Sequence, residues 1–180
     1  KGNVKFMVFI DAENLRRAIN DLRNAEQSFS FDRLFDLISN NGIDSMGVNY
    51  YANSTDLPED FLQFLIDKGV RIVAVPGKEI RGERKGGPVD TVIATDMMDQ
   101  ADRYEEAVLV SGDGDFGYTV EQLIKERGKK VTVISSWRRL GRELTASGAQ
   151  VILLEDLIPV LTYIRKPKPE QPKPQLRVVS

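Results

Sequence analysis

The chain of 180 residues contains no cysteine and no histidine. In this sequence these absences exclude disulfides, thiol nucleophiles, imidazole general bases and zinc sites built from Cys or His. Any catalysis would therefore have to rest on carboxylates, hydroxyls, Lys or Arg, together with a borrowed metal or cofactor. The absence of cysteine also fits a reducing compartment.

Long apolar runs are missing as well. The longest are far shorter than a membrane span, and residues 1–4 do not open an apolar stretch of the signal-peptide kind. We therefore expect a soluble, cytoplasmic protein without a membrane partner. The formal net charge of -2 gives no overall attraction to nucleic acid, so RNA binding would need a local basic patch.

The composition is sufficient for one well-packed domain, because 41% of the residues are hydrophobic. We expect this domain to span residues 1–164. The Lys- and Pro-rich residues 165–180 cannot form a core and should be an extended tail or linker. Since the sequence begins with Lys rather than Met, it leaves open that it is a fragment of a longer chain.

Apolar runs and helical periodicities alternate along the domain. Strands are predicted at residues 5–10, 45–52, 70–75, 108–110, 130–134 and 150–154. Helical patterns lie between them, and a last helix is predicted at 155–164. This order predicts an α/β fold with a mostly parallel sheet of five to six strands. Residues 76–88, with four Gly and two Pro, break the alternation and predict a mobile loop.

The most informative stretch is an acidic corner between a strand and a helix. Residues 108–116 read Val-Leu-Val-Ser-Gly-Asp-Gly-Asp-Phe, and the first strand likewise runs into Asp11 before a helix. Ligands of open α/β sheets bind at the carboxyl ends of the strands, so Asp11, Asp113 and Asp115 should meet at one edge. A short Asp-x-Asp also occurs in structural turns, where Asp113 would only cap the following helix.

A further acid follows the segment at 76–88. Asp90 would lie in the first turn of a helix, where the helix dipole stabilises a carboxylate. Asp96 comes six residues later, about 240° around the helix, so the two acids cannot both face one metal. We therefore place Asp90 at the site and Asp96 as a supporting or capping group.

Two basic segments are candidates for RNA contacts. Arg81, Arg84 and Lys85 lie in the predicted loop, which is either a solvated surface loop or a flap over the acids that touches phosphates. A helix is predicted directly after the loop, and this position favours the interpretation of the loop as a flap. Trp137 and Arg138 follow a strand end, where they either pack around a capped helix or stack on a base and grip a phosphate.

The carboxylates of Asp11, Asp90, Asp113 and Asp115 together predict a metal site. Carboxylates in one cleft repel one another by about 4 kcal/mol per close pair at an effective dielectric near 20, so they need a cation or must partly protonate. Oxygen ligands without imidazole select Mg²⁺ or Mn²⁺. Such an ion would activate a water and stabilise a phosphoryl group in transfer, as in nucleases and phosphatases.

Three blocks of the sequence carry a family resemblance. They are residues 9–14 (Phe-Ile-Asp-Ala-Glu-Asn), residues 87–90 (Gly-Pro-Val-Asp) with Asp96, and residues 110–116 (Val-Ser-Gly-Asp-Gly-Asp-Phe). In order and spacing, over about residues 4–155, they resemble the signature of the NYN-domain family. This family belongs to the PIN-like nuclease superfamily, and the sequence is most similar to its LabA-like branch.

The resemblance implies a PIN-like, three-layer α/β/α sandwich in which the strands before Asp11 and Asp113 lie side by side at the topological switch point. It implies that the same four aspartates form the catalytic metal site, with Asn14 and Ser111 as polar groups beside it. The implied activity is that of a metal-dependent ribonuclease with Mg²⁺ or Mn²⁺, and we expect single-stranded RNA as its substrate. Relatives usually read Lys-Gly-Val-Asp at Asp90, whereas Lys85 lies two residues further upstream, so its role does not follow from the resemblance.

Two other functions remain open. One is a catalytically weak or inactive RNA-binding or regulatory module of the same fold. The other, a phosphohydrolase of the haloacid-dehalogenase kind, needs an Asp-x-Asp-x-Thr motif, whereas residues 11–15 read Asp-Ala-Glu-Asn-Leu. Small PIN-like domains often pair, and some relatives carry a second RNA-binding module. A homodimer and a further module beyond the tail are therefore open as well.

Overall fold

The fold is given by a computed structural model, which describes residues 4–39, 45–80 and 82–165. Arg81 and residues 166–180 lie outside the described residues, so the predicted tail is described only at Arg165. No helix within these three ranges is long and apolar enough to cross a membrane.

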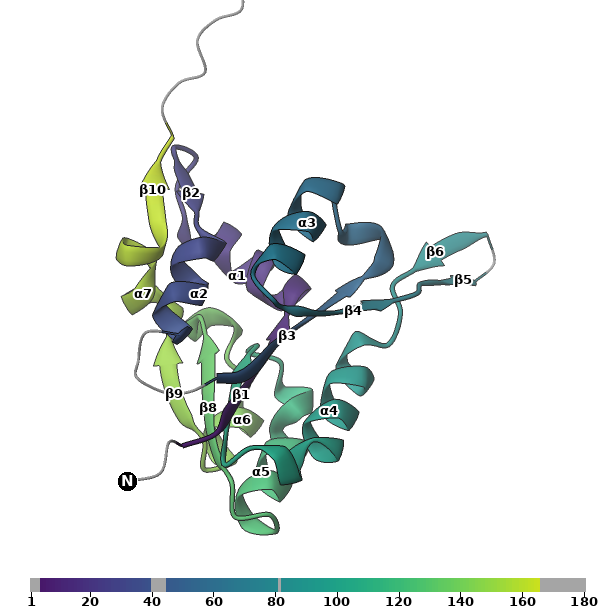
Figure 1. Cartoon of the computed structure of the whole chain (residues 1–180), viewed down its shortest axis with the longest axis vertical. Coiled ribbons are helices and arrows are strands. Elements are labelled where there is room, and N and C mark those ends of the chain that lie inside the picture. Colours follow the sequence, from purple (N-terminus) through teal and green to yellow (C-terminus); the bar gives the residue numbers. More distant parts are fainter. Residues whose placement is uncertain (1–3, 40–44, 81, 166–180) are drawn as a thin grey trace, which may run out of the picture.

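Six parallel strands form the central sheet, in the order β4-β3-β1-β7-β8-β9 (Figure 1). The strands are β1 (Phe6–Asp11), β3 (Ser45–Asn53), β4 (Arg71–Val75), β7 (Glu106–Val110), β8 (Lys130–Ser135) and β9 (Gln150–Leu153). All six were expected from the sequence, with ends that differ by about two residues at most. The predicted mostly parallel sheet is confirmed.

Helices cover both faces of this sheet. One face packs against α1 (Ala12–Leu22), α2 (Phe31–Ser39), α3 (Glu59–Asp67) and α7 (Leu154–Leu161). The other face packs against α4 (Val89–Asp99), α5 (Gly117–Lys125) and α6 (Arg142–Ala146). The chain therefore forms the expected three-layer α/β/α sandwich, with one apolar core on each side of the sheet.

The central strand β1 explains why its sequence is apolar almost throughout. All six of its residues are buried. Val8 and Ile10 face the core beneath α1, whereas Met7 and Phe9 face the core beneath α4. Because side chains alternate along a strand, Asp11 follows on the α4 side, where a carboxylate can meet groups from α4.

The topological switch point lies between β1 and β7. From β1 the chain builds β3 and β4 on one side, and it then crosses to build β7, β8 and β9 on the other. Ile10 pairs with Val110 in the register of these two strands. The acids that follow the two strands thus leave the sheet side by side, at the position where open α/β sheets bind ligands.

Two small antiparallel sheets were not expected. The strand β2 (Gln27–Phe29) pairs with β10 (Thr162–Ile164), so the last helix ends at Leu161 rather than at residue 164. The predicted loop at 76–88 contains β5 (Lys78–Ile80) and β6 (Glu83–Lys85), which form a short ribbon extending from the body of the protein (Figure 1). Gly82, with a φ of 80°, supplies the left-handed residue of its turn.

Candidate functional site

Three aspartates from two separate segments meet at the switch point. Asp90, Asp113 and Asp115 each offer a carboxylate oxygen, and these oxygens lie within 4.8 Å of one another. Asp90 belongs to the first turn of α4, whereas Asp113 and Asp115 lie at the short 3-10 turn η3 (Gly114–Phe116) that follows β7. Asp113 is half-buried and the other two are exposed, so the cluster is open to a ligand.

Hydrogen bonds from three segments hold the corner that presents two of these acids. The Asp113 carboxylate caps η3 by accepting the Asp115 backbone N–H at 3.0 Å. The Gly112 N–H donates to the Asn14 side-chain oxygen at 3.0 Å, and its carbonyl accepts the Gly141 N–H at 2.8 Å. The corner is therefore fixed to α1 on one side and to the segment before α6 on the other.

Asp11 lies beside the three acids and is buried. Its carboxylate accepts the Asn14 backbone N–H at 3.2 Å and the Ser111 hydroxyl at 3.0 Å. The Ser111 oxygen in turn accepts the Asp113 backbone N–H at 3.2 Å. Asn14 and Ser111 thus link Asp11 to the corner, although Asp11 itself is not part of the group formed by Asp90, Asp113 and Asp115.

Burial and mutual repulsion make the acids reluctant to ionise together. Burial raises the pKa of Asp11 to about 6, and the charges of Asp90 and Asp113 act in the same direction. Although Asp90 is exposed, partial desolvation of its carboxylate raises its pKa, and Asp113, Asp115 and Glu13 reinforce that shift. A cation bound among these carboxylates would remove the repulsion, so the site favours either a metal ion or a proton.

Replacing Asp11 with Asn should stabilise the metal-free protein at neutral pH. An acid with a raised folded-state pKa contributes stability that is fully present below its ordinary pKa of 3.8 and is lost as the pH rises through about 6. We expect Asp11→Asn to gain up to about 3 kcal/mol of unfolding free energy over wild type at pH 7.5, and almost nothing near pH 4. Urea denaturation in EDTA across this range measures the difference, and a gain that does not depend on pH would contradict the assignment.

The donor set fits a hard divalent cation. Mg²⁺ and Mn²⁺ favour oxygen ligands, which Mg²⁺ holds at about 2.1 Å, so three carboxylate oxygens this close together can share one ion after small side-chain adjustments. Asp90, Asp113 and Asp115 would supply these oxygens, with Asp11 next to them.

Asp96 points away from the cluster, as its helical spacing predicts. Its carboxylate accepts the Tyr51 hydroxyl and an Arg71 N–H, each at 2.8 Å. Arg71 also donates to the Asn49 side chain at 3.2 Å. Asp96 therefore ties α4 to β3 and β4 and supports Asp90 only by holding their common helix in place.

The structure describes the side chains of only some of the residues predicted to contact RNA. Arg81 lies outside the described residues, and for Arg84 and Lys85 the structure describes only the backbone of β6. Trp137 and Arg138 lie at the carboxyl end of β8, in the 3-10 turn η4 (Trp137–Arg139). Both side chains are exposed, and Trp137 keeps 72% of its surface accessible, so neither is consumed by core packing.

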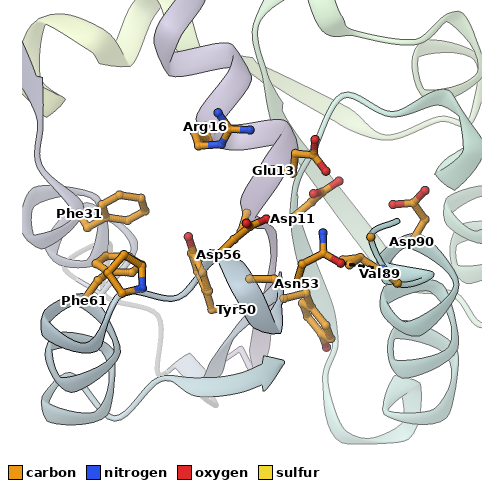
Figure 2. Close-up of a pocket in the computed structure, with 16 residues that line it drawn as sticks. Asp11, Glu13, Arg16, Phe31, Tyr50, Asn53, Asp56, Phe61, Val89 and Asp90 are labelled. Carbon is orange, nitrogen blue, oxygen red and sulfur yellow. Dashed lines mark hydrogen bonds between the residues drawn. The ribbon is translucent and has the colours of Figure 1, made fainter. Parts of the chain in front are cut away.

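A pocket of about 510 Å³ opens next to the acids (Figure 2). Asp11, Glu13 and Asp90 line one end of it, whereas Phe31 and Phe61 line the other. Arg16, Tyr50, Asn53 and Asp56 lie between the two ends, and Gly86 and Gly87 contribute from the base of the β5–β6 ribbon. Sequence periodicity predicts Tyr50 and Phe61 as core residues, so it gave no sign of this pocket.

A carboxylate missed by the sequence reasoning lies next to the corner. A Cβ atom added at Gly114 would overlap with Oε2 of Glu143, so this side chain from α6 packs against the turn between Asp113 and Asp115. No sequence pattern links Glu143 to the corner, because α6 is brought there only by the pairing of β7 with β8.

Comparisons with known proteins agree with this fold. The family model of the NYN domain matches residues 5–155. The low amplitude and bright protein LabA of Synechococcus elongatus is 27% identical over 177 residues, which cover 92% of this chain and 91% of that protein. The crystal structure of a protein of unknown function from Vibrio parahaemolyticus is similar with a TM-score of 0.74 and 22% identity. That match covers 86% of this chain and 94% of the Vibrio chain.

Proposed function

The chain belongs to the NYN domain family, and from this premise we propose that it is a metal-dependent ribonuclease that hydrolyses phosphodiester bonds of single-stranded RNA. The observation that carries the proposal is the group of three aspartates at the switch point, with a fourth beside it. A family that belongs to a nuclease superfamily supports the reaction class, and the carboxylates support the metal.

Each acid has a proposed role that follows from its position. Asp90 and Asp113 would hold Mg²⁺ or Mn²⁺, and Asp115 would complete the ligand set or orient the attacking water. Asp11 is buried behind them and would add its charge to the site from beneath. The bound ion would supply an activated water and charge stabilisation at the phosphate. Arg81, Arg84 and Lys85 of the segment at 76–88, together with Trp137 and Arg138, would contact the RNA.

The test is cleavage of a mixed-sequence, single-stranded RNA in Mn²⁺, in Mg²⁺ and in EDTA. We expect cleavage with either metal and none in EDTA, and we expect added Mn²⁺ to restore activity to the chelated protein. Cleavage that persists unchanged in EDTA would overturn the metal-dependent mechanism.

A second outcome separates catalysis from binding. If the RNA is retained in a salt-sensitive way but is never cut with either metal, the chain is an RNA-binding module of the same fold. A phosphoester model substrate serves as a further control, because a small-molecule phosphohydrolase would hydrolyse it and a ribonuclease of this kind would not.

A further inference from the structure

The pocket beside the acids has one polar end and one aromatic end. Phe31, Tyr50 and Phe61 form an aromatic wall opposite Asp11 and Asp90 (Figure 2). The Phe31 and Phe61 ring centroids are 4.9 Å apart, and Tyr50 meets Phe61 edge to face at 5.6 Å. Phe31 and Phe61 are only half-buried, so their rings border open space rather than closed core.

Polar groups with hydrogen-bonding capacity that no described residue uses lie between the aromatic wall and the acids. The Tyr50 hydroxyl points into the pocket in Figure 2, and within the described ranges it makes no hydrogen bond. Arg16 lines the same space and forms no ion pair with a described carboxylate, unlike its neighbour Arg17, which pairs with Glu13. The Asn53 side-chain oxygen accepts the Gly87 N–H at 2.7 Å, which leaves its amide N–H groups for a ligand.

We propose that the aromatic wall binds the base of one unpaired RNA nucleotide whose phosphate lies at the acids. The inference deepens the proposed function and rests on it. An apolar aromatic surface with a few hydrogen-bonding groups matches a nucleobase, and a pocket of about 510 Å³ is within the usual range for small ligands. A base inside a duplex is stacked and paired and cannot enter such a pocket. The wall therefore selects single-stranded RNA.

The surface next to the pocket carries cations that suit the continuation of the RNA strand. Arg16 and Phe31 also line a neighbouring pocket of about 260 Å³, to which Arg23 and Arg165 contribute. Arg23 donates to the Gln27 carbonyl at 3.2 Å, and Arg165 donates to the Ser28 hydroxyl, so both guanidinium groups are held at this surface. Next to an acidic site, such a row of cations suits the phosphates of nucleotides that leave the pocket.

The test is equilibrium binding of a fluorescently labelled, single-stranded RNA in EDTA, measured by anisotropy, with a blunt RNA duplex of equal length alongside. Phe61→Leu keeps most of the apolar volume and removes the ring face, and we expect it to weaken single-strand binding about tenfold. Phe64→Leu is the matched control, because Phe64 stacks on Phe61 in the same helix but does not line the pocket. It should bind within about twofold of wild type.

Two further variants test the polar groups without disturbing the core. Tyr50→Phe removes only the hydroxyl, and Arg16→Gln removes an exposed charge; we expect a loss of several-fold in single-strand affinity from each. Arg103→Gln, an exposed change at the far end of the sheet, should leave binding unchanged. Duplex binding should be weaker than single-strand binding in wild type and insensitive to Phe61→Leu.

The outcomes separate this inference from the proposed reaction. If Phe61→Leu binds and cuts single strands like wild type, or weakens duplex binding equally, the base pocket is wrong while metal-dependent cleavage can still hold. If single strands bind with the expected dependence on Phe61 but are never cut, the pocket holds and the catalytic proposal fails.

Discussion

The Asp113→Asn variant is expected to lose RNA cleavage by about 10²- to 10³-fold and to keep the wild-type fold. A metal ion contributes several kcal/mol of charge stabilisation to phosphoryl transfer, and each 1.36 kcal/mol is about tenfold in rate. The substitution removes a charged ligand and little volume. Asn also retains the side-chain oxygen that accepts the Asp115 N–H, so the cap of η3 persists. Cleavage rates in Mn²⁺ and thermal unfolding by circular dichroism measure the two effects.

A matched control comes from α4. Asp99 is exposed and lies nine residues after Asp90, about 180° around the helix, so its charge faces away from the cluster. Asp90→Asn should lose activity as Asp113→Asn does, whereas Asp99→Asn should cut RNA at the wild-type rate. Full cleavage activity in Asp113→Asn, or an equal loss of cleavage activity in Asp99→Asn, would contradict the assignment of the metal site.

The long elements of this fold follow from local sequence. Most strands of the central sheet are short apolar runs, and the sequence of β3 has the alternating apolar residues Met46, Val48 and Tyr50. The main helices repeat apolar residues at helical spacing, so these signals can be read from the sequence without tertiary information. The β2–β10 pair has no such signal, because it joins two three-residue segments that are 133 positions apart at Phe29 and Thr162. The segment of the β5–β6 ribbon is rich in charged residues and glycine, and this composition is equally typical of a loop.

The sequence predicts the aspartates of the candidate site but not the residues that line the pocket beside them. An aspartate directly after a buried strand is visible in the sequence, and parallel strands bring such residues to one edge. How deeply Asp11 is buried depends on packing by α1 and the corner after β7, which no local pattern encodes. Tyr50 and Phe61 have the periodicity of core residues, and only the space left between α3 and the acids makes them line a pocket.

The corner itself depends on the absence of a side chain at Gly112. A Cβ atom there would overlap with the Ser135 hydroxyl and the Arg139 carbonyl oxygen, and it would lie 2.8 Å from the Arg139 carbonyl carbon. Two of these atoms belong to the backbone of η4, which cannot rotate away as a flexible side chain can. Gly112 therefore lets β7 and the segment after β8 approach closely enough to present Asp113 and Asp115.

Gly112→Ala should cost more than about 3 kcal/mol of unfolding free energy, the upper end for overpacking, and should displace both acids enough to abolish cleavage. Gly69→Ala is the comparison: at a φ of 72° with no atom within 4 Å of the new Cβ, it should cost only about 1–2 kcal/mol from backbone strain and leave cleavage intact. Urea denaturation and the RNA assay measure both. If Gly112→Ala is no less stable than Gly69→Ala, contact with η4 does not shape the corner, and the position of the two aspartates must be fixed by the hydrogen bonds that Ser111, Asn14 and Gly141 make there.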